Sequence, residues 1–266
     1  MLYKRVISGL LFLPIFYLVT WRLPPVYFTA LVLLAAAMGQ YEFYRMAQAR
    51  GFHPQRALGT TLGVLIVIWF YHPLIPEQDR FLVLTVSLLL IIVARLFSSR
   101  PVDGALEDVA ATFLGVFYVA MLFAFQVVIR TGVNGKQWLV FLYFIIWASD
   151  IGAYSIGIPF GRHRLYEKVS PKKSIEGLAG ALVASAGMAL ICRIWFMPAM
   201  GTAEAIEIAL ALSAVGTIGD LAESLFKRAV GVKDSGGIIP GHGGILDRMD
   251  SMLFAAPILY YYLRLR

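Results

Sequence analysis

Long runs of apolar residues, separated by short polar stretches, follow one another along almost the whole chain. Each run is close to the length that a helix needs to cross the hydrocarbon core of a bilayer, about 30 Å. The runs lie at residues 5–21, 25–46, 58–75, 81–97, 108–130, 137–158, 174–198, 203–222 and 249–264. The pattern therefore predicts an all-α integral membrane protein with about nine transmembrane helices.

The composition agrees with a membrane protein. Of the 266 residues, 59% are hydrophobic and 15% are charged, whereas soluble domains average about 25% charged residues. The net charge of +7 would suit a nucleic-acid partner in a soluble chain. Here the bases lie in short loops between apolar runs, where membrane topology and anionic lipid account for them. We therefore expect the lipid bilayer as a partner and no nucleic acid.

The distribution of positive charge predicts the orientation. With the N-terminus in the cytoplasm, most of the 23 lysines and arginines fall on the cytoplasmic side, as the positive-inside rule requires. Nine crossings then give an N-in, C-out topology, and the loops at 159–173 and 223–248 emerge together on the cytoplasmic side. We divide the chain into an N-terminal scaffold of about five helices, residues 1–135, and a second transmembrane region, residues 136–266, which contains both of these cytoplasmic loops.

Four aspartates lie within or at the ends of apolar runs: Asp150, Asp220, Asp247 and Asp250. An ionisable side chain is costly inside a bilayer and is a functional candidate for that reason. The alternative for each one alone is a helix cap or a buried ion pair. Taken together, the four supply the carboxylate oxygens that a hard cation such as Mg²⁺ prefers, and a polar cavity facing the cytoplasm would hold them.

A strip of polar side chains follows Asp220 at helical spacing. If the helix continues past the membrane surface, Asp220, Ser224, Lys227 and Arg228 share one face. An acid, a hydroxyl and two cations would then line a single strip. The alternative for Lys227 and Arg228 is positive charge that serves topology alone.

A glycine-rich segment, residues 233–244, separates this strip from Asp247. Glycines such as Gly243 and Gly244 let backbone N–H groups approach an anion, and the start of the next helix favours negative charge. Lys233 and Arg248 flank the segment, so it is a candidate site for phosphate and metal together. His242 is a candidate acid, base or phosphate donor, with a structural hydrogen bond as the alternative.

The other cytoplasmic loop, residues 159–173, is also basic. Lys172 and Lys173 end it, and its bases could bind lipid headgroups or the phosphates of a nucleotide. The alternative is again positive charge that serves topology alone.

These motifs resemble the signature of the phosphatidate cytidylyltransferases, also called CDP-diacylglycerol synthases. The residues that carry the resemblance are Ser224–Arg228, Lys233–Gly244 and Asp247–Asp250, with further blocks at Asp150–Tyr154, Lys168–Lys173 and Gly219–Ser224. The likeness is strong over residues 140–256 and only general over 1–135. Ile151 replaces the small hydroxyl residue of the family pattern, and Ser174-Ile175 replaces Thr-Trp.

The resemblance implies that CTP and phosphatidate react to give CDP-diacylglycerol and pyrophosphate, with Mg²⁺ and room for a second cation such as K⁺. It implies a homodimer in the bacterial cytoplasmic membrane, with the site facing the cytoplasm. It assigns metal binding to Asp220 and Asp247, with Asp150 and Asp250 as further ligands, and catalytic positions to Asp220, Asp247, Ser224, Lys227, Arg228 and His242. It assigns substrate binding to Lys172, Lys173, Lys233, Arg248, Gly243 and Gly244.

Two other classes of protein share some of these features. Another membrane transferase, one that moves a different nucleotide or phosphoalcohol onto a lipid, would need similar bases and acids. An ion-coupled transporter also carries acids within its helices. In this sequence the acids cluster with bases and glycines at one membrane face, which suits phosphate chemistry better than an ion path through the midplane.

Overall fold

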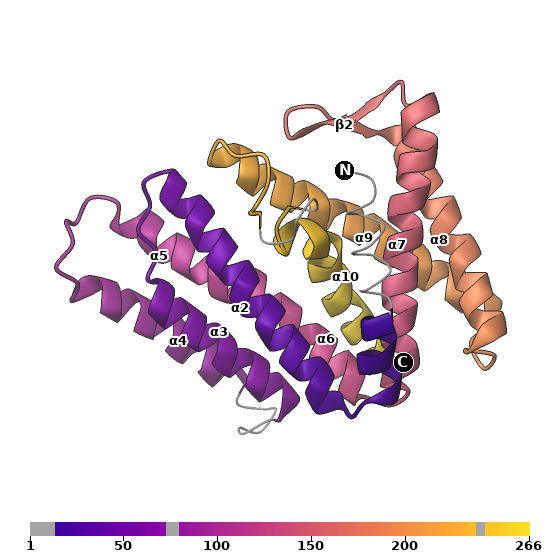
Figure 1. Ribbon diagram of the computed structural model, residues 1–266, viewed down its shortest axis with the longest axis horizontal. Helices are drawn as coiled ribbons and strands as arrows, with labels where there is room; N and C mark the ends of the chain where they lie inside the picture. The colour runs from indigo at the N-terminus through magenta and orange to yellow at the C-terminus, as the bar shows by residue number, and fades with distance from the viewer. Residues whose placement is uncertain (1–13, 73–79, 238–242) are drawn as a thin grey trace. The chain divides into compact units, whose positions relative to one another are not determined.

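The computed structural model describes residues 14–72, 80–237 and 243–266, and helices make up nearly all of their regular structure (Figure 1). The chain forms two compact units. The first consists of residues 1–131 and 229–248, and the second of residues 132–228 and 249–266. The two units are described separately below.

The first unit contains helices that follow one another with short connections. They are η1 (Leu18–Arg22), α2 (Pro25–Ala49), α3 (Arg56–Tyr71), α4 (Arg80–Leu96), α5 (Ala105–Leu114), η3 (Gly115–Ala120) and α6 (Met121–Thr131). The last three form one unbroken helix whose middle, η3, is widened into a π-helical turn. A proline at the first position of α2 fits a helix start, where no backbone N–H is needed.

The long helix Ala105–Thr131 provides much of the core of the first unit. Side chains such as Val119 and Phe123 are fully buried on it. Two buried polar side chains of α2 are hydrogen-bonded here: Tyr44 Oη donates to the carbonyl of Thr112 at 3.2 Å, and Gln40 Nε2 donates to the carbonyl of Gly59 at 2.9 Å. These bonds satisfy groups that would otherwise be costly in an apolar core.

A buried ion pair ties the α2–α3 and α4–α5 connections together. Arg95 Nε lies 3.0 Å from Asp108 Oδ2, and both side chains are almost fully buried. Asp108 Oδ1 also accepts from the backbone N–H of His53, and Arg95 Nη2 donates to the carbonyl of Pro101 at 2.6 Å. The carboxylate and the guanidinium thus each receive backbone partners, which a buried pair needs in order to be stable.

The second unit contains three long helices, a small hairpin and most of a fourth helix. The elements are α7 (Gly135–Phe160), β1 (Arg164–Tyr166), β2 (Ser170–Ser174), α8 (Ile175–Trp195), α9 (Thr202–Ala229) and α10 (Leu246–Leu265). The strands pair antiparallel, with Arg164 opposite Ser174. Ser174 then caps α8, because its Oγ accepts from the N–H of Gly177 at 3.1 Å. The expected loop at 159–173 is therefore largely a hairpin.

Helices α7 and α8 lie side by side (Figure 1) and approach closely through glycines. A Cβ on Gly152 would come 2.6 Å from the Cβ of Ala184, and a Cβ on Gly180 would come 2.6 Å from Cγ1 of Ile156. Small residues at such positions are typical of helices that pack within membranes. A hydrogen bond of 2.8 Å between the hydroxyls of Ser149 and Ser213 joins α7 to α9.

Five helices of the described chain are long and apolar enough to cross a membrane, at Pro25–Ala49, Ala105–Thr131, Gly135–Phe160, Ile175–Trp195 and Thr202–Ala229. Two shorter apolar helices lie at Arg56–Tyr71 and Phe81–Leu96. These findings agree with an all-α membrane protein. The count of nine crossings and the N-in orientation stay predictions, and most of the first predicted run lies outside the described residues.

Substitution of Gly180 by alanine should weaken the α7–α8 contact, since a Cβ there meets Ile156 and the backbone of Gly152. We expect a loss of about 1–3 kcal/mol, the usual cost of overpacking. The measurement is the midpoint of thermal unfolding in detergent. Gly187→Ala on the same helix is the matched control, because no described atom lies within 4 Å of its new Cβ. Equal midpoints for the two variants would contradict the packing argument.

Candidate active site

Helix α9 carries the polar strip that the sequence predicted. It runs without a break to Ala229, so Asp220, Ser224, Lys227 and Arg228 are all helical. Lys227 Nζ lies 3.0 Å from Oε2 of Glu223, and both side chains are at least nine-tenths buried. The lysine thus neutralises a buried acid one turn earlier, a pairing that the i, i+4 spacing allows.

The basic hairpin meets this strip at Asp220. Lys173 Nζ on β2 lies 2.6 Å from Oδ2 of Asp220, and both side chains are partly exposed. Lys172, the preceding residue of β2, is exposed, as the alternation of side chains along a strand leads one to expect. Arg228 Nε also reaches the hairpin, since it donates to the carbonyl of Val169 at 3.4 Å. Two segments that are distant in sequence therefore share one group of charges.

Helix α10 adds a third acid to the group. A Cβ on Gly219 would lie 2.6 Å from the carbonyl oxygen of Asp250, so this glycine lets α9 and α10 approach closely. The Asp250 carboxyl consequently interacts electrostatically with both Asp220 and Glu223. We call these side chains the α9 cluster: Lys173, Asp220, Glu223, Lys227 and Asp250.

The α9 cluster brings three carboxyl groups together with two ammonium groups. Carboxylate oxygens are the donors that Mg²⁺ prefers, and a cation would relieve the repulsion between like charges. Within the described residues, however, no three His, Cys, Asp or Glu side chains are placed as a ready metal site. The cluster therefore matches Mg²⁺ in the chemistry of its donors, while the carboxylate of Asp220 is paired with Lys173.

Asp150 and Ser224 lie in the second unit as well. Asp150 is on an exposed part of α7, and Ser224 is partly buried on α9, one turn beyond Asp220. Both residues therefore lie on helices of the unit that also contains the α9 cluster.

A second polar group lies in the first unit, where the glycine-rich segment leads into α10. Asp247 Oδ2 accepts from the N–H of Ser235 at 3.0 Å, from the Ser235 hydroxyl at 2.9 Å and from the N–H of Gly244 at 2.8 Å. A single carboxylate oxygen of Asp247 thus links Ser235 to Gly244. Lys233 and Arg248, which flank the segment, are both exposed.

Glu42 of α2 anchors the same segment, and the sequence analysis missed it. Its side chain is buried, and its carboxylate accepts from the N–H groups of Ile245 at 3.0 Å and Leu246 at 3.1 Å. It also accepts from the Ser235 hydroxyl at 3.3 Å. A signal was present, because Glu42 is an acid within an apolar run, the property that singled out Asp220.

Gly243 and Gly244 are fitted to these carboxylates. Gly243 has a φ of 82°, a left-handed conformation that favours glycine, and a Cβ there would lie 2.6 Å from Oδ2 of Asp247. A Cβ on Gly244 would collide with the Ser235 hydroxyl and with Glu42. Because the N–H of Gly244 donates to Asp247, the glycines serve here to bring backbone and carboxylate together. His242 lies outside the described residues.

Comparison with known proteins identifies the class. The fold and the acid–base cluster define a helical protein of the membrane type with a polar site, and its sequence matches the cytidylyltransferase family over residues 3–266. The chain belongs to that family, so the resemblance seen in the sequence is confirmed.

Several relatives are named phosphatidate cytidylyltransferase. The protein from Bacillus subtilis is 32% identical over 98% of this chain and 97% of its own length. The one from Synechocystis is 33% identical over 89% of this chain and 88% of its own. The one from Staphylococcus aureus (strain COL) is 41% identical over 57% of this chain and 58% of its own.

Replacing Glu42 with alanine should release the segment that precedes α10, because the amides of Ile245 and Leu246 lose their acceptors. Each lost bond to a charged acceptor is worth about 1.5–3 kcal/mol, so we expect these amides to exchange hydrogen at least tenfold faster. Hydrogen–deuterium exchange of a peptide spanning 243–250 measures this. Glu107→Ala, an exposed acid of the same unit, is the control. Unchanged exchange in the Glu42 variant would show that the segment is held by other contacts.

Proposed function

We propose that this protein transfers the cytidylyl group of CTP to phosphatidate, giving CDP-diacylglycerol and pyrophosphate. The observation that carries the proposal is the match to a relative of that name along nearly the full length of both chains. The α9 cluster supports it, since acids and bases side by side suit a reaction between two phosphates. The apolar helices suit a substrate that stays in the bilayer.

The chemistry asks for positioning more than for a strong base. A phosphate oxygen of phosphatidate attacks the α-phosphorus of CTP in line, a new P–O bond forms, and the bond to the β-phosphate breaks as pyrophosphate leaves. The attacking phosphate monoester is largely ionised at neutral pH, so its oxygen needs no strong general base. Catalysis then rests on orientation and on neutralising charge that shifts to the leaving group.

Basic side chains would carry that neutralisation. In our proposal Lys227 and Arg228 of α9, with Lys233 and Arg248, hold the triphosphate and the departing pyrophosphate, as charge-assisted bonds to phosphate do. Lys172 and Lys173 meet the lipid phosphate or CTP. Phosphate oxygens are positioned by Ser224 and His242, and the substrate-binding backbone includes Gly243 and Gly244.

Mg²⁺ is part of the proposal. Asp220 and Asp247 would hold it, with Asp150 and Asp250 as further ligands, and the family resemblance supports a second cation such as K⁺. When bound, the metal would neutralise phosphate charge. Two facts about the α9 cluster support this: its donors are carboxylates, and Asp220 already pairs with a cationic group, the ammonium of Lys173.

The setting of the reaction follows from its substrates. Phosphatidate is held in the membrane and CTP is dissolved in the cytosol, so we place the protein in the bacterial cytoplasmic membrane with its site open to the cytoplasm. The positive-inside charge pattern supports this placement. The family resemblance supports a homodimer.

The direct test supplies purified protein with labelled CTP, phosphatidate and Mg²⁺ in detergent and extracts the lipid. We expect a lipid-soluble cytidine product and equimolar pyrophosphate. Omitting phosphatidate or adding a chelator is the control for each requirement. A folded preparation that forms no cytidine lipid would contradict the proposal.

Asp220→Asn should lower turnover by about 10²–10³-fold, because the amide cannot supply the negative charge that metal binding needs. Initial rates across a Mg²⁺ titration provide the measurement. The matched control is Glu207→Gln, an exposed acid on the same helix. The same substitution at Asp247 should act alike, and near-normal turnover in either aspartate variant would remove that residue from the metal site.

Lys173→Ala should lower kcat/KM by about tenfold or more, since a bond to a charged group is worth roughly 1.5–3 kcal/mol. Lys172→Ala, at the exposed neighbouring position, should act through substrate binding as well. Separate titrations of CTP and phosphatidate would show which substrate each lysine meets. Lys136→Ala, an exposed lysine at the start of α7, should behave as wild type. Unaltered kinetics for both substrates in both variants would exclude the hairpin from the site.

A further inference from the structure

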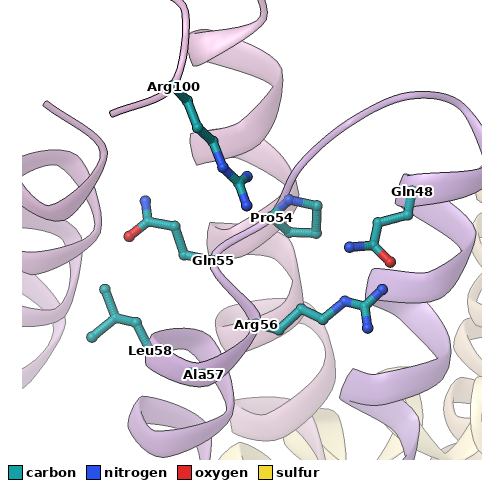
Figure 2. Close-up of a pocket in the computed structure, with 7 residues that line it drawn as sticks. All are labelled: Gln48, Pro54, Gln55, Arg56, Ala57, Leu58 and Arg100. Atoms are coloured by element: carbon teal, nitrogen blue, oxygen red, sulfur yellow. The ribbon is translucent and has the colours of Figure 1, made fainter. Parts of the chain in front are cut away.

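The first unit contains an open pocket where the α2–α3 connection meets the loop before α5. It has a volume of about 540 Å³ and is lined by Gln48, Pro54, Gln55, Arg56, Ala57, Leu58 and Arg100. Figure 2 shows the carboxamide of Gln48 and the guanidinium of Arg56 pointing toward one another, with Arg100 reaching in from its own loop. None of the lining residues belongs to the α9 cluster or to the segment held by Glu42.

The pocket carries positive charge that its own walls do not balance. Two of the described residues that line it are arginines, and none is an acid. Arg56 Nε is buried and has no hydrogen-bond partner in the described part of the chain. Arg100 Nη1 donates to the carbonyl of His53 at 2.5 Å, which leaves the other donors of that guanidinium available. Two guanidinium groups with no acid beside them in the wall favour an anion in the pocket.

The backbone at the start of α3 adds partial positive charge to the pocket. Residues 55–58 of the pocket wall are the cap and first turn of α3, and within the described residues no side chain caps that helix. The N–H of Arg56 donates to the carbonyl of Pro54 at 2.9 Å. A helix of 16 residues places partial positive charge at its start, and that charge faces the pocket that the two guanidinium groups line.

The pocket walls are held in place by bonds outside the pocket. The N–H of Gln55 donates to Oγ1 of Thr112 at 2.9 Å, and its Nε2 donates to the carbonyl of Ile91 at 2.8 Å. The buried pair of Arg95 and Asp108 fixes the loop that carries Arg100. Binding of an anion therefore requires little ordering of the walls, which favours affinity.

We propose that this pocket binds a phosphate group, either that of an anionic lipid headgroup or that of a soluble phosphate compound. Guanidinium groups present a planar fork of donors that matches phosphate oxygens, and two of them suit a doubly charged group. The site is additional to the one that would hold CTP and phosphatidate. It does not depend on the proposed reaction.

The test measures binding, with Arg56→Gln/Arg100→Gln as the variant. Inorganic phosphate, which is neither a substrate nor a product of the proposed reaction, is titrated into the detergent-purified protein by calorimetry. Retention of phosphatidylglycerol against phosphatidylcholine is followed by native mass spectrometry. The control, Arg22→Gln/Lys136→Gln, removes the same charge at exposed positions. We expect the variant to bind at least one of the two anionic probes about tenfold more weakly than the wild type and the control do.

Each outcome has a defined meaning. Weaker retention of phosphatidylglycerol alone identifies a lipid headgroup as the source of the phosphate, and weaker binding of inorganic phosphate alone identifies a soluble compound. Binding of both probes equal to wild type overturns the proposal. If the double variant fails to fold, Arg100→Gln alone serves instead, because Arg100 is exposed. That single variant must still weaken one probe at least threefold for the proposal to stand.

Discussion

Neutralisation of acids inside apolar helices is the constraint on which this structure depends. A carboxylate without partners costs several kcal/mol in such surroundings, and each buried acid described above has them. Asp108 pairs with Arg95, Glu223 pairs with Lys227, and Glu42 receives backbone amides. These pairings fix connections as well as charges, since Asp108 also accepts from His53 of the α2–α3 connection and Glu42 accepts from Ile245 of the segment before α10. Loop geometry in the first unit is thus set by buried acids.

The sequence predicted well what depends on local pattern. The apolar runs predicted an all-α membrane protein, and five of the described helices are long and apolar enough to cross a membrane. The spacing of Asp220, Ser224 and Lys227 placed them on one continuous helix, as α9 shows. The hairpin at Arg164–Ser174 was not predicted. Its strands are short and polar, so they lack the alternation of apolar and polar residues that reveals a strand.

Contacts between distant segments could not be predicted from spacing. Glu42 and the amide of Ile245 are 203 positions apart, and Lys173 meets Asp220 from the β1–β2 hairpin. Such pairs depend on how helices pack, and the close approach at Gly219 that brings in Asp250 is a property of tertiary structure. The motif identified which residues carry chemistry, while packing determines which of them meet.

The two kinds of partner lead to different uses of an acid. Backbone amides are fixed by the fold, so Glu42 and Asp247 hold the segment before α10 in one shape. A lysine ammonium sits on a flexible stem and can be replaced by another cation, as at the partly exposed pair of Lys173 and Asp220. Exchangeable cations and partial exposure are what binding of phosphates and metal requires. The pair of Lys173 and Asp220 has both properties, whereas Glu42 is buried and held by backbone amides, so Glu42 serves to hold the segment before α10 in shape.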